Sequence, residues 1–354
     1  MTHPSFAVAD LDRAVSADVI DRATADQLAT FLNQGQDSAA SPDSEDEQFR
    51  LVSGFGDIFV AIGLVLFLGA LFFLTLDENL LLPAVATAVA SWGLAELFTR
   101  MRRQALPSIL LLVAFAATVF IAAAKVIDGG DSTALTSGFG EAATVAGAGL
   151  ITCASVALHW WRFRVPVTVA AACAAGSAAV VGLLETALPG VMTGFGGLIF
   201  LPLGVAVFLL AMRFDTSDRE RRTRRTDIAF WLHALAAPMV VHPVMQNIMR
   251  DETPGAGAAG LTFVVFAVLG FVALTVDRRA MLVSSLVYLG YAIYSILQAG
   301  NALPSTSFVV LLVGAVVLGL SLAWRPLRAS LLGVVPKAIA ERVPPAHITS
   351  FKTG

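Results

Sequence analysis

The chain has 354 residues, of which 57% are hydrophobic and 14% are charged. Its mean hydropathy of +0.78 excludes the two or three soluble domains that this length would otherwise suggest. We therefore expect an all-α, polytopic transmembrane helix bundle whose first partner is the lipid bilayer.

The amino-terminal part is polar and precedes the apolar region. Residues 1–34 are predicted to form a cytoplasmic pair of short helices, with Thr24 and Gln27 in a capping-box pattern and Leu28 on the apolar face that follows. Residues 35–57 are acidic and have few large apolar side chains, so they are predicted to be a flexible linker. The helix pair is interpreted either as a docking module or as a solvated tail.

The segment ADQLATFLNQ, the acidic linker and a glycine-rich first apolar run stand together at the start of the chain. In this combination the chain resembles a loose class of bacterial polytopic membrane proteins of unknown function. The resemblance covers about the first 80 residues. It implies a multi-pass protein of the bacterial inner (cytoplasmic) membrane and carries no activity.

Residues 58–324 contain apolar runs of about twenty residues, the length that a helix needs to cross a bilayer. The predicted spans are 58–76, 80–99, 105–124, 141–161, 165–184, 191–212, 227–248, 257–276, 280–299 and 304–324. Four prolines fall in the first turn of a span, where their missing N–H costs nothing: Pro83, Pro107, Pro166 and Pro304. The sequence therefore predicts ten spans.

The loop charges predict the orientation of these spans. With both termini inside, the inner segments hold 21 of the 23 basic residues, and only Lys125 and Arg250 lie outside. The longest basic cluster lies between the sixth and seventh spans and includes Arg219, Arg221, Arg222, Arg224 and Arg225. Between two spans, such a cluster indicates orientation and an affinity for anionic lipid, not for nucleic acid.

Residues 325–354 are predicted to be a cytoplasmic tail. Leu327, Leu331 and Val335 recur at helical spacing beside arginines, which is typical of a short helix on the membrane surface.

A Gly-Phe-Gly triplet opens the first span at 54–56 and the sixth at 194–196. Two halves of five spans each would be inverted, as in many secondary transporters, and Pro202 would act as a hinge in a broken sixth helix. A third triplet at 138–140 fits no such symmetry. The alternative interpretation is therefore that the triplets recur by chance.

The seventh span is the most polar. Its distinctive residues are His233, Pro238, His242, Pro243, Gln246 and Asn247. The two histidines are nine residues apart and lie on opposite helix faces, which excludes one metal held by both on a straight helix. Two interpretations remain: a proline-kinked helix that lines a polar cavity, or polar groups that hydrogen-bond neighbouring helices.

The ninth span holds all three tyrosines of the chain, Tyr288, Tyr291 and Tyr294. Because a buried hydroxyl needs a partner, we expect this stripe to face the seventh span and to pair with His233, His242 or Gln246.

No Asp, Glu, Lys or Arg lies near the membrane midplane of these predicted spans, which argues against a carboxylate-based pump. Glu96 is expected to pair with Arg100 one turn away. No nucleotide-binding, zincin, hydrolase or zinc-ribbon motif occurs, so we predict no catalytic residue, metal or cofactor. An enzyme that uses the histidines is therefore less well supported than the two hypotheses that follow.

The leading hypothesis is a transporter or channel-like carrier of a small neutral or weakly polar solute. Its predicted binding residues are His233, His242, Gln246, Asn247, Tyr288, Tyr291 and Tyr294, with hinges at Pro202, Pro238 and Pro243. The alternative is a non-catalytic scaffold or regulatory protein that docks a partner through its amino-terminal helices.

Overall fold

The computed structural model divides into two units, residues 1–50 with 349–354 and residues 51–348, and each is described by itself. It describes residues 11, 15–17, 19–28, 55–76, 80–129, 142–192, 196–218, 221, 223–248, 256–299, 306–340 and 343. The smaller unit contains a helix over residues 22–28. The first helix of the predicted pair falls mostly outside the described residues.

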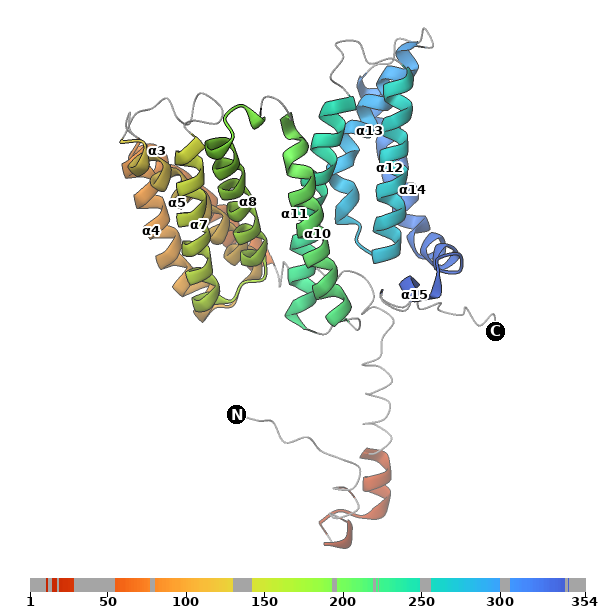
Figure 1. The fold of residues 1–354 in the computed structure, drawn as a ribbon. Helices are drawn as coiled ribbons and strands as arrows, with labels where there is room; N and C mark the ends of the chain where they lie inside the picture. Colours follow the sequence, from red (N-terminus) through yellow and green to blue (C-terminus); the bar gives the residue numbers. More distant parts are fainter. Residues whose placement is uncertain are drawn as a thin grey trace. The chain divides into compact units, whose positions relative to one another are not determined.

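In the larger unit, every regular element of the described ranges is a helix (Figure 1). The elements are α3 (Phe55–Leu74), α4 (Leu81–Ala95), η2 (Glu96–Met101), α5 (Ala105–Ile127), α7 (Ala142–Phe163), α8 (Val167–Ala187), η3 (Gly196–Ile199), α10 (Phe200–Ser217), α11 (Arg224–Ile248), α12 (Ala256–Val276), α13 (Ala280–Ala299), α14 (Thr306–Leu332) and α15 (Lys337–Ala340). Among the described residues, nine helices are long and apolar enough to cross a membrane. At the place of the ninth predicted span, α13 is a helix of 20 residues.

Three helix boundaries differ from the predicted ones. Helix α10 continues to Ser217, past the predicted end at residue 212. Helix α14 continues through Pro326 to Leu332, so the segment predicted as a separate surface helix is largely the end of α14. Helix α4 changes into the π-helix η2 at Glu96. In α10 and α14 the backbone hydrogen bonds continue where hydropathy alone suggests a boundary, whereas the change at Glu96 lies inside the predicted second span.

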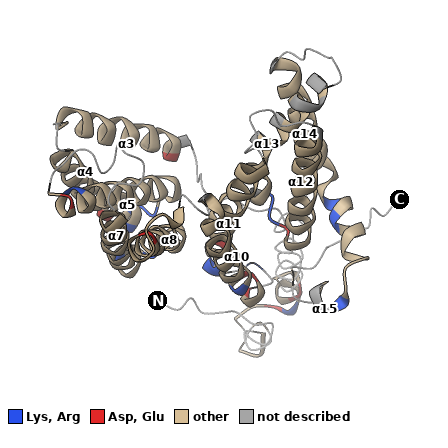
Figure 2. Cartoon of the chain, turned by 45° about the horizontal axis from the view of Figure 1, so that its top comes forward, with Lys and Arg blue, Asp and Glu red and all other residues tan. Residues whose placement is uncertain are grey.

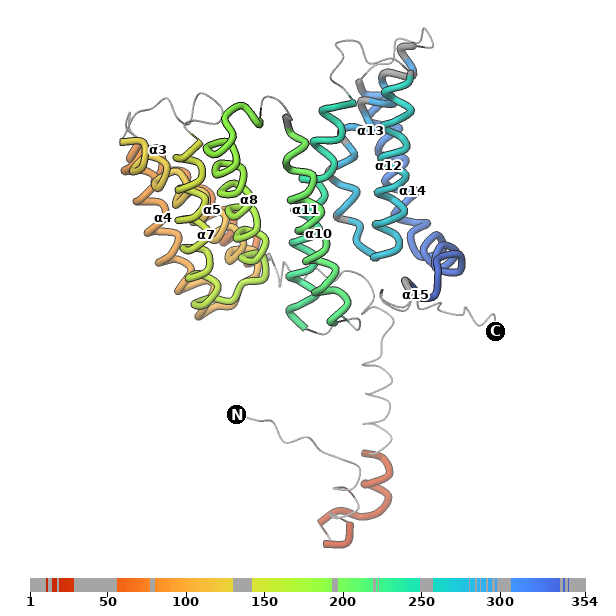
Figure 3. Tube along the Cα trace, in the orientation of Figure 1, coloured from red at the N-terminus to blue at the C-terminus, as the bar shows by residue number. Residues whose placement is uncertain are grey.

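Consecutive helices lie next to one another, with α4 on α5, α7 on α8, α10 on α11 and α12 on α13 (Figure 3). The closest approach is between α7 and α8. A Cβ atom at Gly149 would lie 2.7 Å from the backbone N of Ala179, and one at Gly182 would lie 2.5 Å from the backbone N of Ala146. Small residues therefore let these two backbones touch, as is common between membrane helices.

Helix α11 joins the amino-terminal helices to the carboxy-terminal ones. Its buried residues Leu232 and Ala236 pack with Ala170 of α8 and Val207 of α10. On another side, Met245 belongs to a cluster with residues of α12, α13 and α14. Figure 2 shows that charged residues lie mainly towards the ends of the helices, while most of their length is apolar.

Candidate functional site

A row of neutral polar side chains connects α11 with α13. His242 Nδ1 hydrogen-bonds the hydroxyl of Tyr288, and the Gln246 amide nitrogen lies 3.0 Å from His242 Nε2. Because an amide N–H can only donate, Nε2 accepts, and the proton of the neutral imidazole lies on Nδ1 and is donated to Tyr288. In this tautomer, neither bond uses the hydroxyl hydrogen of Tyr288.

The row also reaches the start of α10. A Cβ atom at Gly197 in η3 would lie 2.7 Å from Gln246 Oε1, so the amide end of the Gln246 side chain lies against the backbone of η3. The Asn247 amide donates to the carbonyl oxygen of Pro243 at 2.8 Å within its own helix. His242, Gln246 and Asn247 are all exposed. The sixth, seventh and ninth helices thus meet at the polar residues that the sequence singled out.

The tyrosine stripe meets α11 at one described position. Tyr288 contacts His242, whereas the Tyr294 side chain is 38% exposed. The side chain of Tyr291 lies outside the described residues. The predicted pairing with His242 is therefore confirmed for Tyr288.

The three prolines predicted as hinges occupy two kinds of position. Pro238 and Pro243 lie inside α11, which continues through both. Pro202 lies in the first turn of α10, immediately after the 3-10 turn of η3. The helix type therefore changes just before Pro202, and α11 contains two positions that lack a backbone donor.

His233 lies away from this row and is fully buried. Its Nε2 is 2.8 Å from Oδ2 of Asp215, near the end of α10. A carboxylate can only accept, so Nε2 carries the imidazole proton. His233 is one of three residues predicted to pair with the tyrosines of the ninth span. In the structure its partner is Asp215 instead.

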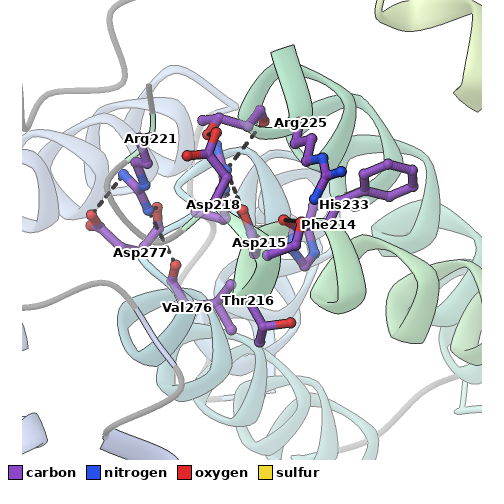
Figure 4. A network of polar contacts seen from close by, with 12 residues as sticks. Phe214, Asp215, Thr216, Asp218, Arg221, Arg225, His233, Val276 and Asp277 are labelled. Carbon is purple, nitrogen blue, oxygen red and sulfur yellow. Dashed lines mark hydrogen bonds and ion pairs between the residues drawn. The ribbon is translucent and has the colours of Figure 1, made fainter. Parts of the chain in front are cut away.

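Asp215 is bound from a second side by Arg278, which follows α12. Figure 4 shows Asp215 beside His233. Arg278 Nη2 lies 2.5 Å from Oδ1, and Arg278 Nε lies 3.4 Å from Oδ2. Asp215 is 3% exposed and Arg278 is 1% exposed. Arg278 also donates to the carbonyl oxygen of Thr226 at 3.2 Å. A buried carboxylate therefore holds α11 and the α12–α13 turn together.

Sequence reasoning missed Asp215 because the sixth span was predicted to end at residue 212. The inventory of charge inside the spans is corrected accordingly: Asp215 belongs to a membrane-length helix and is buried. A signal was available, since Val207, Ala211 and Asp215 are spaced i, i+4, i+8 and are buried on the same helix. Continuing that face past residue 212 would have included the carboxylate.

The α12–α13 turn makes a second set of polar contacts. Asp277 Oδ2 accepts from Arg221 Nη1 at 3.0 Å, and Asp277 Oδ1 accepts from Trp324 Nε1 at 2.8 Å. Arg328 Nε lies 3.6 Å from Oδ1 of the same carboxylate. Arg221 and Asp277 have φ angles of 54° and 61°, a left-handed region that costs energy for residues other than glycine. Two strained residues are thus held against each other by an ion pair.

These contacts restrict the predicted lipid-binding cluster. The Arg221 side chain is 12% exposed and is directed to Asp277, so Arg221 is corrected from a lipid contact to an internal one. Arg224 and Arg225 are exposed at the start of α11. Arg219 and Arg222 lie outside the described residues.

Asp218 organises the connection between α10 and α11. Its Oδ2 accepts hydrogen bonds from the Thr223 backbone N–H at 2.8 Å, the Thr223 hydroxyl at 2.6 Å and the Thr226 hydroxyl at 3.0 Å. A carboxylate beside the first turn of α11 satisfies donors that a helix start leaves without partners.

A separate polar cluster joins α4 to α7. Glu96 accepts two hydrogen bonds of 2.8 Å from Arg162, beside the predicted contact of 3.2 Å with Arg100. One turn before Arg162, His159 is 1% exposed and is packed against the rings of Trp92, Phe115 and Phe163. Neither ring nitrogen of His159 has a hydrogen-bond partner among the described residues.

The two sites on α11 have different chemistry. The row of His242, Gln246 and Tyr288, in which the first two side chains are exposed and the third is half-buried, can bind a neutral molecule through hydrogen bonds. The buried group of Asp215, His233 and Arg278 brings a carboxylate, an imidazole and a guanidinium into direct contact away from solvent. Comparison of the chain with protein-family models, curated proteins and solved structures finds no match.

Proposed function

We propose that this protein is a carrier in a bacterial inner membrane that moves a small neutral or weakly polar solute. The observation that supports the proposal is the hydrogen-bonded row of exposed His242, exposed Gln246 and half-buried Tyr288 within the helical bundle. Polar groups exposed to hydrocarbon are costly, so they are expected where they line a solute path.

The proposed solute is neutral because the row itself is neutral. It combines an imidazole, an amide and a phenol, and Asn247 lies on the next position of α11. The hydroxyl hydrogen of Tyr288 is proposed to be donated to the solute. The row contains no guanidinium or ammonium group to bind an anion.

The proposed topology has ten spans with both termini in the cytoplasm, and it adds α13, as the ninth span in chain order, to the nine helices that qualify by length and hydropathy. The basic residues of the inner loops support this orientation. The five-plus-five repeat and the hinge roles of Pro202, Pro238 and Pro243 belong to the same proposal. Anionic lipid is proposed to bind at the exposed Arg224 and Arg225.

Osmotic swelling of proteoliposomes tests the carrier function. We expect glycerol and urea to enter vesicles that contain the protein faster than empty vesicles. Gln246→Leu should slow this entry by about tenfold, because it removes the amide that orients His242 and hydrogen bonds are worth about 1 kcal/mol or more in such sites.

Ser155→Ala provides the matched control. Ser155 is exposed on α7 and donates to a carbonyl of its own helix, so its removal deletes a polar group far from α11 in the sequence. Entry of both solutes at the rate of empty vesicles would contradict the proposal for this solute class.

The second candidate is a scaffold that docks a partner through its amino-terminal unit. It is favoured by the separation of residues 1–50 into a unit of their own and by the helix over residues 22–28. Deleting residues 1–50 distinguishes the two functions. A carrier keeps its solute flux, whereas a scaffold loses the co-purifying partner.

A further inference from the structure

Asp215 is a carboxylate whose two oxygens are held by donors from different elements. His233 of α11 binds Oδ2, and Arg278 of the α12–α13 turn binds Oδ1. All three side chains are at most 3% exposed. Removing such a charge from water is unfavourable unless it is paired and hydrogen-bonded. The ionised form of Asp215 therefore favours the packed arrangement of these elements.

The same physics applies in reverse when the elements separate. If the α12–α13 turn moves away, Asp215 loses the positive charge of Arg278 in a poorly solvated place. A carboxylate in that situation binds a proton more readily, because its ionised form has lost the ion pair that stabilised it. A proton on Asp215 and separation of the turn thus promote each other.

The imidazole of His233 does not compensate for that loss. Its Nδ1 is buried without a hydrogen-bond partner among the described residues, while Nε2 donates to Asp215. A second proton on the ring would place an unsatisfied N–H and a positive charge in the interior. In the packed arrangement His233 is a neutral donor, which leaves Asp215 as the group that can change charge.

Titratable and charged groups surround Asp215 from several elements, and Figure 4 shows His233, Asp218, Arg221 and Asp277 among them. They are His233 on α11, Arg278 and Asp277 in the α12–α13 turn, Arg221 and Asp218 between α10 and α11, and Arg328 on α14. Asp277, Arg221 and Arg328 form their own contacts, so Arg278 and His233 remain the direct partners of Asp215.

We propose that Asp215 is a proton-binding site, and that its protonation releases the α12–α13 turn from α10 and α11. This proposal rests on the proposed carrier function, for which it supplies a coupling ion, the proton. Proton uptake removes the charge that pairs with Arg278 and weakens the hydrogen bond that His233 donates. The contact between Asp277 and Arg221 is a separate ion pair between the turn and the α10–α11 connection, and it does not involve Asp215.

Cysteine accessibility in the full-length chain tests the proposal without a known solute. In a Cys153→Ala, Cys173→Ala background, Met281→Cys places a thiol at a position that is 3% exposed, just after Arg278. Ser217→Cys, at an exposed position, serves as the reference for the pH dependence of the reagent. The probe is a membrane-impermeant maleimide added to purified protein in liposomes.

We expect labelling at position 281, relative to position 217, to increase as the pH falls from about 7 towards the ordinary pKa of aspartate, about 4. Asp215→Asn should raise this ratio by at least about tenfold at the higher pH and remove its pH dependence. The matched control is Asp277→Asn, which changes the other carboxylate network and should retain the pH dependence.

A labelling ratio that does not change with pH while Asp215 is present would overturn the proposal. This measurement does not depend on whether an Asp215 variant folds. A pH dependence that survives in Asp215→Asn would also overturn it. If solute flux is observed but the labelling ratio does not change with pH, the carrier function stands and the proton site is rejected. A pH-dependent ratio without flux of any solute would keep the proton site and reject the carrier.

Discussion

At the scale of single residues, Asp215 shows how a charge is accommodated in a membrane-length helix. Its neighbours His233 and Arg278 are as buried as the carboxylate itself. The desolvation of each charge costs several kcal/mol, which the ion pair and the hydrogen bonds offset only when all partners are present. Removing one member of the ion pair should therefore lower the free energy of unfolding more than removing both members.

Arg278→Gln is expected to lower the free energy of unfolding by about 3–5 kcal/mol, because it leaves Asp215 charged and buried. The double variant with Asp215→Asn should lose clearly less, since neither charge remains. Denaturation in detergent, followed by circular dichroism, measures both. Equal or additive losses would show that the two residues do not act as a pair.

His159 gives the opposite expectation. Its two ring nitrogens lack hydrogen-bond partners among the described residues, and its ring packs against Phe115 and Phe163. His159→Phe should therefore leave the melting temperature unchanged or raise it, because buried polar atoms are replaced by apolar ones. His159→Ala should lower stability by about 2–4 kcal/mol through the cavity that it leaves. A strong loss in His159→Phe would reveal a polar role for the ring.

Asp21 provides a pH-dependent contact outside the membrane helices. The Thr24 hydroxyl donates to its carboxylate and, as the largest cause, holds the pKa of Asp21 below its ordinary value. Asp21 precedes the helix over residues 22–28 and is its cap, whereas Thr24, predicted to be the cap, lies inside that helix.

A lowered pKa means that this cap contributes stability above the ordinary pKa of aspartate and loses it as the pH falls through the lowered value. We expect Thr24→Val to move the pKa of Asp21 back towards its ordinary value, as followed by NMR titration of the side-chain carboxyl. An unchanged titration curve would exclude the hydroxyl as the cause.

At the scale of elements, α7 and α8 form the tightest helix pair. Gly149→Ala would place a Cβ atom 2.7 Å from the backbone N of Ala179, and backbone cannot move aside as a flexible side chain can. The expected loss is about 1–3 kcal/mol, the usual cost of overpacking.

Gly176→Ala is the control on α8, because no heavy atom lies within 4 Å of its added Cβ. This substitution should be neutral or stabilising by up to about 1 kcal/mol, since alanine favours helix more than glycine does. Thermal unfolding of the two variants side by side decides whether contact or helix propensity controls this pair.

At the scale of the whole molecule, the open question is how often the chain crosses the bilayer. Nine helices of the described ranges qualify by length and hydropathy, and the ten-span proposal adds α13. Only with α13 as a span do the carboxy terminus and the arginine-rich loops fall on one side.

Reporter fusions test this topology. We expect green fluorescent protein to fluoresce when fused after Arg103, Arg164 or Arg279, and alkaline phosphatase to be active after Gly190 or Ala299. The pair Arg279 and Ala299 flanks α13. The same reporter active at both positions would show that α13 does not cross the membrane.

The sequence by itself determined the class of molecule and the approximate place of the helices. Runs of apolar residues, prolines in first turns and arginine-rich loops are local properties, and local properties suffice to predict where a helix crosses a bilayer. They also identified His242, Gln246 and Tyr288 as unusual, because polarity inside an apolar run is visible without a structure.

Only the tertiary structure decided which of these residues are partners. Asp215 and Arg278 are separated by 63 positions, Glu96 and Arg162 by 66, and His242 and Tyr288 by 46. Helical periodicity fixes the face on which a residue lies but not the helix that this face meets. That choice depends on how all the helices pack at once, which is why hydropathy places Asp215 beyond the sixth span, whereas α10 includes it and packing against His233 and Arg278 buries it.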